Sequence, residues 1–353
     1  MKRAILGMVT VVALSAVLFA CNQGTSMPQT AGEAKPSGTV ASGPAPKLSG
    51  KLTVYTSIQP EPLDKIKEAV KKALPGVEVG WFQASTEPLI AKIDAEMQAG
   101  KVAADVLMVA DPSYYVFLKS RGILHTYKSP NAAGAMGIQD PDGYYTSVRV
   151  INAVIGYNTR LVKKEDAPRK FVDLTGPSWK GKVGIPDATQ SGSAFDTVAA
   201  LSGKYGWEYY RGLKSNQAVI ADGQGALEKK LVSGEVAVAT ILEMNILMSK
   251  AKGEPIELVY PEDGVGVFPS PIGIIKTTAN PDAARAMIDW WFTKEGQQSI
   301  TEGFMHSVRK DVAPPAGAVP LSDFVGRALP IDWDKLSKDI PGLKDKFTAI
   351  MRD

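Results

Sequence analysis

The sequence predicts an α/β protein of two lobes, in which each lobe is a mostly parallel sheet flanked by helices and crossing strands join the two. Strand-like runs alternate with amphipathic helical runs between Lys51 and Glu302, a pattern typical of parallel sheets covered on both faces. The length of 353 residues also exceeds what one hydrophobic core usually serves. The β-rich runs Val148–Tyr157 and Ile272–Lys276 fit strands that pass from one lobe to the other.

The first 20 residues have the composition of an export signal. Two basic residues precede an uncharged apolar run over 4–20, whose length is marginal for a permanent membrane span. Cys21 is the only cysteine of the chain, and the segment Leu18–Cys21 resembles the lipobox of bacterial lipoproteins. We therefore expect residues 1–20 to be a lipoprotein signal peptide and acylated Cys21 to hold the protein on the lipid bilayer. An incidental cysteine after an ordinary secretory signal is the alternative.

Residues 21–47 are predicted to be a flexible, lipid-anchored tether. They are rich in Gly, Ser, Thr, Ala and Pro and contain almost no large apolar side chain, so they cannot offset the entropy of ordering. Without the signal peptide, the 40 basic residues fall to 38 against 37 acidic ones. A balance this close to neutral argues against nucleic acid as a partner.

Three strands and two helices are predicted in the first part of the folded chain. Apolar residues recur at helical spacing over 63–74, after Pro60, and over 89–97, before Gly100. The strands are Lys51–Tyr55, Val77–Phe82 and Asp105–Val109.

After Val148–Tyr157 the same alternation predicts a second α/β sheet. Its strands are Lys182–Ile185, Ala218–Ile220, Val236–Ile241 and Ile256–Tyr260, and its helices are Ser193–Lys204 and Ala226–Val232. Helices Asp282–Thr293 and Gly296–Glu302 follow the crossing strand Ile272–Lys276, and the last 30 residues look helical and amphipathic. We assign 48–148 plus 266–318 to lobe 1 and 149–265 plus 319–353 to lobe 2.

The chain resembles the solute-binding lipoproteins of bacterial ABC importers, of the type II periplasmic-binding-protein class that contains ferric-ion, hexose-phosphate and aminoethylphosphonate receptors. The resemblance covers about Leu48 to Pro315. It rests on Leu52–Ser57, Ala104–Leu107, Ile151–Asn158, Asp187–Ala194, Gly234–Ala237, Val259–Gly266, Asn280–Ala284 and Lys294–Gln298 in this order and spacing. It implies a non-enzymatic receptor on the outer face of a membrane, with an ABC permease and an ATPase as partners. We expect a monomer.

Two loops are the main candidates for ligand binding. Gln190, Ser191, Gly192 and Ser193 precede a predicted helix, whose free N–H groups and positive end, together with two hydroxyls, suit an anion. A plain N-cap has the same residue preferences and is the alternative. Tyr55–Ser57 follows the first strand and would face the first loop across a cleft at the carboxyl ends of both sheets. Tyr55, Thr56 and Ser57 would supply an aromatic wall and two hydroxyls, unless they form only a solvated turn.

Three further residues are candidates for the same cleft. Asp111 and Glu243 follow predicted strands and would suit an amine or a metal, although either could be a helix cap. Tyr145 could line the pocket, although an aromatic on a strand is more often in the core.

A small organophosphate, either a phosphonate or a sugar phosphate, is the ligand that the sequence favours, and no cofactor or protein-held metal is expected. Within the resembled class, ferric-ion receptors carry adjacent tyrosines after the strand that here ends near Ile241, and this chain has Leu242-Glu243-Met244 there. Ferric ion is thus the second choice. Enzyme motifs are absent, and His125 and His306 stand isolated in the sequence. A ligand-sensing lipoprotein and a secreted hydrolase built on paired carboxylates stay open as other classes.

Overall fold

The structure is a computed structural model that describes residues 48–353, which belong to one compact unit. The predicted signal peptide, Cys21 and the tether lie outside the described residues. None of the helices within 48–353 is both long enough and apolar enough to cross a bilayer.

Three parallel strands form the sheet of the first lobe. They are β1 (Gly50–Thr56), β2 (Val77–Gln83) and β3 (Val106–Met108), in the order β2-β1-β3. Apolar side chains alternate along β1, so that Leu52 and Val54 face one core cluster and Tyr55 faces another. The helices of this lobe are α1 (Pro60–Ala73), α2 (Thr86–Gln98), α3 (Pro112–Ser120), α8 (Pro281–Trp291) and α9 (Lys294–Glu302).

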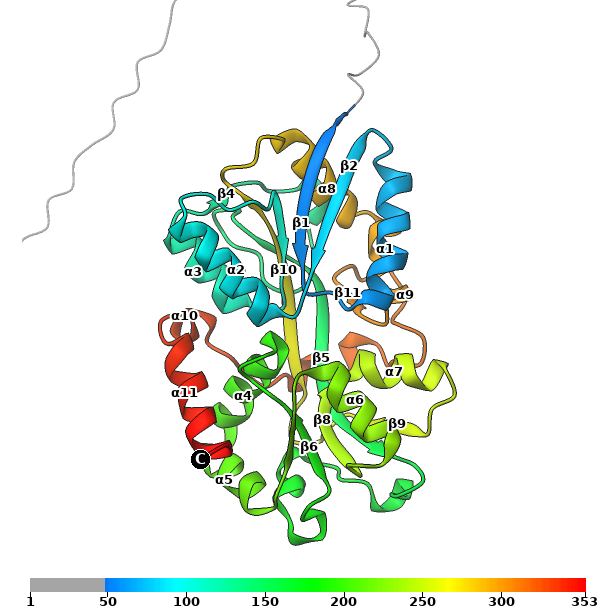
Figure 1. The fold of residues 1–353 in the computed structure, drawn as a ribbon. Coiled ribbons are helices and arrows are strands. Elements are labelled where there is room, and N and C mark those ends of the chain that lie inside the picture. Colours follow the sequence, from blue (N-terminus) through cyan, green and yellow to red (C-terminus); the bar gives the residue numbers. More distant parts are fainter. Residues whose placement is uncertain (1–47) are drawn as a thin grey trace, which may run out of the picture. The chain divides into compact units, whose positions relative to one another are not determined.

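Two long strands connect the lobes (Figure 1). β5 (Thr146–Asn158) and β10 (Gly266–Ile275) pair antiparallel with each other. β10 also pairs with β3 of the first sheet, and β5 pairs with β8 of the second. This connection confirms the predicted two-lobed α/β class with crossing strands, while the exact lobe boundaries stay a prediction because both strands belong to both sheets.

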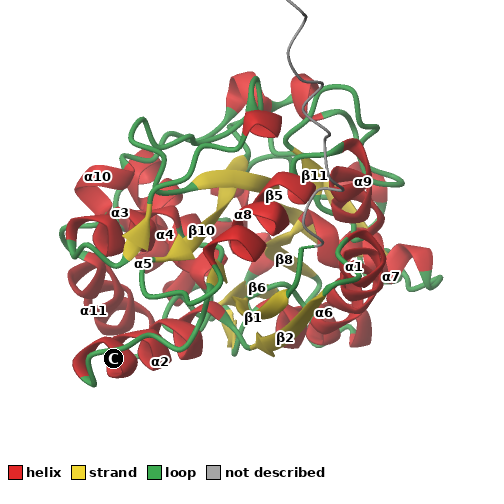
Figure 2. Ribbon diagram, turned by 90° about the horizontal axis from the view of Figure 1, so that it is seen from above, coloured by secondary structure: helices red, strands yellow, loops and turns green. Residues whose placement is uncertain are grey.

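The second lobe repeats the pattern of the first. Its parallel strands are β6 (Val183–Pro186), β7 (Val219–Ala221) and β8 (Val238–Leu242), and β9 (Ile256–Val259) pairs antiparallel with β5. Its helices are α4 (Gly192–Tyr205), α5 (Glu208–Ser215), α6 (Gln224–Ser233) and α7 (Glu243–Ala251). Helices cover the strands on both sides (Figure 2).

Short elements complete the described chain. β4 (Leu124–His125) pairs with β10, and β11 (His306–Ser307) pairs with β5. Near the C-terminus, α10 (Trp333–Leu336) packs on α3 of the first lobe, and α11 (Ile340–Met351) packs on α4 and α5 of the second.

Two differences from the predicted elements have clear physical causes. Helix α7 was not predicted, because Glu243 through Ser249 are all buried and the segment therefore lacks an amphipathic pattern. Strand β10 starts six residues before the predicted strand, because Pro269 and Pro271 argue against a central strand in the sequence. The sheet accommodates them with a shift of register between Ser270 and Pro271.

Candidate functional site

A cavity of about 360 Å³ lies between the two lobes. Both lobes and the crossing strand β5 contribute to its wall. The lining residues are mostly small or polar: Ser57, Gln59, Pro60, Gln83, Ser85, Thr86, Ala110, Arg149, Ile151, Ser191, Ser193, Asp222, Gly223, Gln224, Gly225, Ala226, Lys229, Leu242 and Met244. We call this cavity the cleft.

The N-termini of five helices meet at the cleft, because parallel strands bring their carboxyl ends, and the helices that follow, to one edge. The lining includes the N-cap residue or first turn of α1, α2, α4, α6 and α7. The first N–H groups of a helix have no acceptor within the helix, and its N-terminal end carries partial positive charge. The fold therefore directs the positive N-terminal ends of five helices at the cleft.

Four of these five N-termini have no side-chain cap: α1, α2, α6 and α7. Only α4 is capped, by Ser191 Oγ, which accepts from the N–H of Ala194 at a long 3.4 Å. Ser193 Oγ contacts Ser191 Oγ at 3.1 Å and accepts from Gln224 Nε2 at 3.2 Å. The hydroxyls of Ser191 and Ser193 at the start of α4 and the side-chain amide of Gln224 on α6 thus form one continuous polar part of the cleft wall.

Arg149 provides a buried positive charge at the wall of the cleft. It lies on β5 and is 2% exposed, with Nε donating to Ser270 Oγ at 3.0 Å. Among residues 48–353, no carboxylate forms an ion pair with it. Burial lowers the pKa of Arg149 to about 10, so the guanidinium is still charged at neutral pH. An anion would supply the missing counter-charge.

The other charged groups of the wall lie at its exposed edge. Lys229 of α6 and Asp222, before α6, are both exposed side chains. Asp222 is the only acidic residue of the lining, which contains no tyrosine and no histidine.

The two lobes touch directly beside the cleft. A Cβ atom placed on Gly192 would lie 2.6 Å from the carbonyl oxygen of Ala110 and 2.7 Å from Cγ2 of Thr86. Gln59 Nε2 of the first lobe donates to Asn245 Oδ1 of the second at 3.1 Å. The absence of a side chain at Gly192 therefore permits this closed arrangement.

Of the residues predicted from sequence, Ser57, Ser191 and Ser193 line the cleft. Ser57 Oγ also accepts from the N–H of Ala110 at 3.1 Å. Gln190 and Gly192 are not in the lining, but they flank Ser191, and Gly192 is the first residue of α4. The structure thus brings the two predicted loops together across the cleft.

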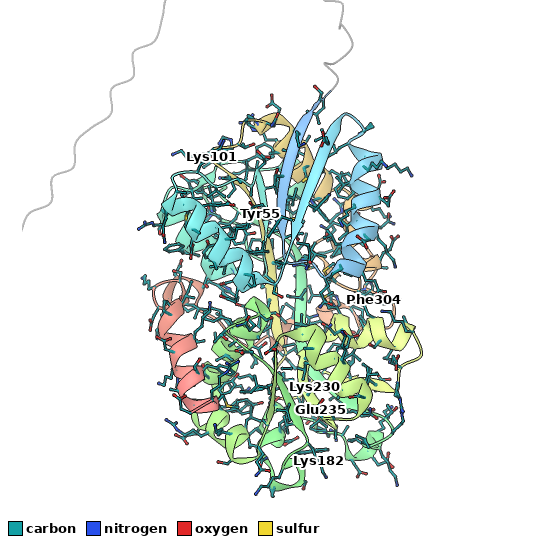
Figure 3. All side chains as sticks on the ribbon, in the orientation of Figure 1. Tyr55, Lys101, Lys182, Lys230, Glu235 and Phe304 are labelled. Carbon is teal, nitrogen blue, oxygen red and sulfur yellow. The ribbon has the colours of Figure 1, made fainter. Side chains whose placement is uncertain are left out.

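Tyr55, Thr56 and Tyr145 lie outside the lining, which corrects the expectation of an aromatic wall. Tyr55 faces α2, where its hydroxyl donates to Glu96 Oε1 at 2.8 Å (Figure 3). The Thr56 side chain is fully buried and accepts from the N–H of Ile58. Tyr145 is buried in the same core cluster as Tyr55, with its ring centroid 5.6 Å from that of Tyr115. Alternation along β1 turns the Tyr55 ring away from the cleft, and Tyr145 lies just before β5.

Asp111 also lies outside the lining and caps α3. Its Oδ1 accepts from Ser113 Oγ at 2.6 Å and from the N–H of Tyr114 at 3.2 Å. Asp111 therefore has the second of the two roles considered for it from the sequence, that of a helix cap.

Glu243 lies behind the cleft wall rather than in it. The carboxylate is 1% exposed, accepts from Asn152 Nδ2 at 2.7 Å and from the hydroxyl of Tyr260, and lies 2.7 Å from His306 Nε2. His306 is therefore not isolated in space. His125 is not either, since its Nε2 lies 3.1 Å from a guanidinium nitrogen of Arg285.

Sequence reasoning missed Arg149, Lys229 and Gln224. Arg149 had a usable signal, because it is the one charge in the apolar run predicted as a crossing strand, and a buried charge needs a partner. Lys229 and Gln224 had none, since both look like ordinary polar positions of a surface helix.

Comparison with known proteins gives relatives of low identity but wide coverage. A probable ABC transporter periplasmic-binding protein of Sinorhizobium fredii is 23% identical over 326 residues, which is 87% of this chain and 88% of that one. The major ferric iron-binding protein of Neisseria meningitidis serogroup B is 22% identical over 267 residues, 71% of this chain and 78% of that one.

Solved structures share the fold. The periplasmic binding protein AfuA from Actinobacillus pleuropneumoniae, with exogenous fructose-6-phosphate bound, has a TM-score of 0.76 at 23% identity, covering 86% of this chain and 99% of that one. Iron-bound HitA from Pseudomonas aeruginosa has a TM-score of 0.73 at 22% identity, covering 84% and 99%.

The family assignment rests on the sequence. Residues 102–339 match the family described as bacterial extracellular solute-binding protein. This match spans more than half of the chain, and it confirms the class that the ordered motifs indicated. The chain therefore belongs to the bacterial extracellular solute-binding proteins.

Proposed function

We propose that this protein captures a small anionic solute, a phosphonate or a sugar phosphate, in the cleft and delivers it to its membrane importer. The observation that carries the proposal is the charge of the cleft wall. Buried Arg149 and five helix N-termini surround a cavity whose only carboxylate, Asp222, is exposed. Positive helix ends and a guanidinium are the groups that bind phosphate oxygens in proteins.

The remaining polar groups of the wall suit the uncharged part of such a ligand. Gln59, Thr86 and Gln224 come from three different helices and present amide and hydroxyl groups. Such groups can donate to or accept from ligand hydroxyls. A cavity of about 360 Å³ lies within the usual range for small-ligand sites. The solved relative that carries fructose-6-phosphate supports this ligand class by its fold.

Ferric ion is the second candidate because several relatives of this chain are named for iron binding. A ferric ion prefers hard anionic oxygen ligands. The cleft wall offers one exposed carboxylate, no tyrosine and no histidine. The lining residues therefore favour an oxyanion over a bare ferric ion.

A ligand screen tests the proposal. Fructose 6-phosphate, glucose 6-phosphate, methylphosphonate and aminoethylphosphonate, each at 100 times its Kd, should stabilise the folded protein by about 2.7 kcal/mol and raise the melting temperature. Differential scanning fluorimetry measures the shift, with the corresponding unphosphorylated sugars as controls. If no phosphorylated compound raised the melting temperature and ferric ion did, the protein would instead be a ferric-ion receptor.

The hydroxyl of Ser193 should contribute directly to binding. Ser193→Ala removes a hydroxyl that lines the cleft and is not the cap of α4. We expect the Kd of the best compound from the screen to rise about 10-fold, as for one lost hydrogen bond to a charged group, while the melting temperature of the unliganded protein changes little. Isothermal titration calorimetry measures the Kd. Loss of stability with an unchanged Kd would give Ser193 a structural role.

We further propose that the protein is a monomeric, non-catalytic receptor anchored to the membrane through acylated Cys21. The export-type leader and the lipobox-like segment support the anchor. The non-catalytic role is supported by the relatives, which are named as binding proteins. Mass spectrometry of the mature N-terminus tests the acylation, and uptake by a strain that lacks the gene tests the transport role.

A further inference from the structure

Three carboxyl groups lie directly behind the cleft, where the lobes meet. Glu87 is in the first turn of α2 and Asp111 caps α3, both in the first lobe, while Asp196 is in the second turn of α4, in the second lobe. Glu87 and Asp111 each follow a cleft-lining residue directly. We call Glu87, Asp111 and Asp196 the carboxyl cluster.

The geometry of α4 turns Asp196 toward the first lobe. The Cα of Gly192 faces the carbonyl oxygen of Ala110, which directly precedes Asp111. Residues four apart share one face of a helix, so Asp196 lies on the same face as Gly192. Asp196 therefore faces the start of α3 across the boundary between the lobes.

The cluster has more buried oxygens than donors. Asp196 and Asp111 are fully buried. Both carboxyl oxygens of Asp196, Oδ2 of Asp111 and Oε1 of Glu87 have no hydrogen-bond partner within the described part of the chain. A buried ionised carboxylate without partners is costly, and protonation removes most of that cost.

Lys344 of α11 is the cation at the cluster. It forms an ion pair with Glu87 across the lobe boundary, and its Nζ lies 5.2 Å from the ring centroid of Phe195. The other titratable groups that act on the cluster are Asp94 of α2 and Tyr114 and Tyr115 of α3, and the Tyr114 hydroxyl donates to Asp94 Oδ1 at 2.8 Å. One lysine thus faces three carboxyl groups, and Asp94 adds a further acidic group nearby.

Burial is the main cause of raised pKa values throughout the cluster. It raises the pKa of Glu87 and of Asp111, although Lys344 opposes both shifts. It raises the pKa of Asp196 well above the usual range, with Asp111 and Glu87 adding to the shift. The pKa of Tyr114 is also raised, so its phenol stays neutral.

We propose that closing of the lobes takes up protons at the carboxyl cluster, so that a fall in pH favours the closed, solute-holding form. Separation of the lobes would return these carboxyl groups to water, where they ionise. The closed form then binds more protons than the open form, and by linkage its population rises as the pH falls toward the ordinary carboxyl range near 4. In this pH-dependent closure of the lobes, Asp196 and Lys344 act as positioning residues. This proposal rests on the proposed function in one respect only, which is that closure of the lobes serves to capture the solute.

The test measures closure without any solute, so its outcome does not depend on the ligand class proposed above. Spin labels are attached to Ala91→Cys on α2 and Ala349→Cys on α11, two exposed neutral positions, in a full-length Cys21→Ser background that contains no other cysteine. Pulsed electron paramagnetic resonance gives the distance distribution at several pH values between about 8 and about 5.5. Each linked proton should raise the closed-to-open ratio by up to about 10-fold per pH unit.

Asp196→Asn tests the assigned residue, because the amide matches the shape of the carboxyl group but cannot ionise. We expect this variant to be more closed than the wild type at about pH 8 and to respond less to pH. Glu235→Gln is the matched control, since Glu235 pairs with Lys230 in the second lobe, outside the cleft wall (Figure 3), and should keep the wild-type response. If Asp196→Asn is unstable, the same distance measurement on Glu87→Gln tests the carboxyl cluster. A pH-independent wild-type distribution, or a wild-type response in folded Asp196→Asn and Glu87→Gln, would overturn the proposal.

Discussion

Arg149→Met is expected to abolish tight solute binding while leaving the unliganded protein as stable as before, or more stable. The methionine fills most of the volume of the arginine but carries no charge. Each hydrogen bond between the guanidinium and an anion contributes about 1.5–3 kcal/mol, so the Kd should rise by at least about 100-fold. In the absence of ligand, the substitution removes a buried charge without a carboxylate partner among the described residues, and such charges cost stability.

Calorimetric titration with the best compound from the ligand screen and thermal melting of the unliganded variant measure the two effects. Arg285→Met is the control, because Arg285 lies on α8 outside the cleft wall and forms an ion pair with Asp282. It should leave the Kd unchanged. If Arg149→Met bound the compound as tightly as the wild type, the anion site would have to lie elsewhere.

Gly192→Ala is expected to weaken binding by at least about 10-fold through steric exclusion rather than loss of a contact. The new Cβ atom would lie 2.6 Å from the carbonyl oxygen of Ala110, a distance that real Cβ atoms do not reach, so the lobes would have to part. The separation disfavours the closed form that holds the solute, and the apparent affinity falls with the population of that form. The open form does not suffer the clash, and alanine is a better helix residue than glycine.

Gly203→Ala provides a matched control for this substitution. Gly203 lies in the same helix α4, and a Cβ atom there meets nothing within 4 Å. Both variants should therefore keep or raise the melting temperature of the unliganded protein, by the gain in helix propensity of up to about 1 kcal/mol. Only Gly192→Ala should lose affinity. Equal Kd values for the two variants would show that the contact at Gly192 does not control closure.

The fold was readable from the sequence because its determinants are local. Amphipathic spacing over α1 and uniform burial over β3 each follow from side chains within one segment. The exceptions include two segments whose local pattern is misleading: α7, which is buried on all sides, and β10, which contains two prolines.

Only part of the candidate site could be predicted from the sequence, because only some of its residues give a local signal. Ser191 and Ser193 could be found because a helix start next to a glycine and two serines is a local signal. Tyr55 was assigned to the wrong side of its strand, since the side of a strand that meets the cleft depends on how the sheet is covered, and Tyr145, just before β5, packs into the core cluster of Tyr55 instead. Asp111 and Glu243 were left between two roles, and their hydrogen-bond partners in space make them a helix cap and a buried network member.

The sequence by itself determined the alternation of strands and helices and the family, and it predicts the export-type leader and the candidate anion-binding loop before α4. Each of these depends on residues that are neighbours along the chain. Only the tertiary structure decided that Arg149 reaches the cleft, that five helix N-termini meet there, and that Glu87, Asp111 and Asp196 from two lobes share one buried space. Those features depend on burial and on electrostatic interactions between segments far apart in the chain, which no local pattern encodes.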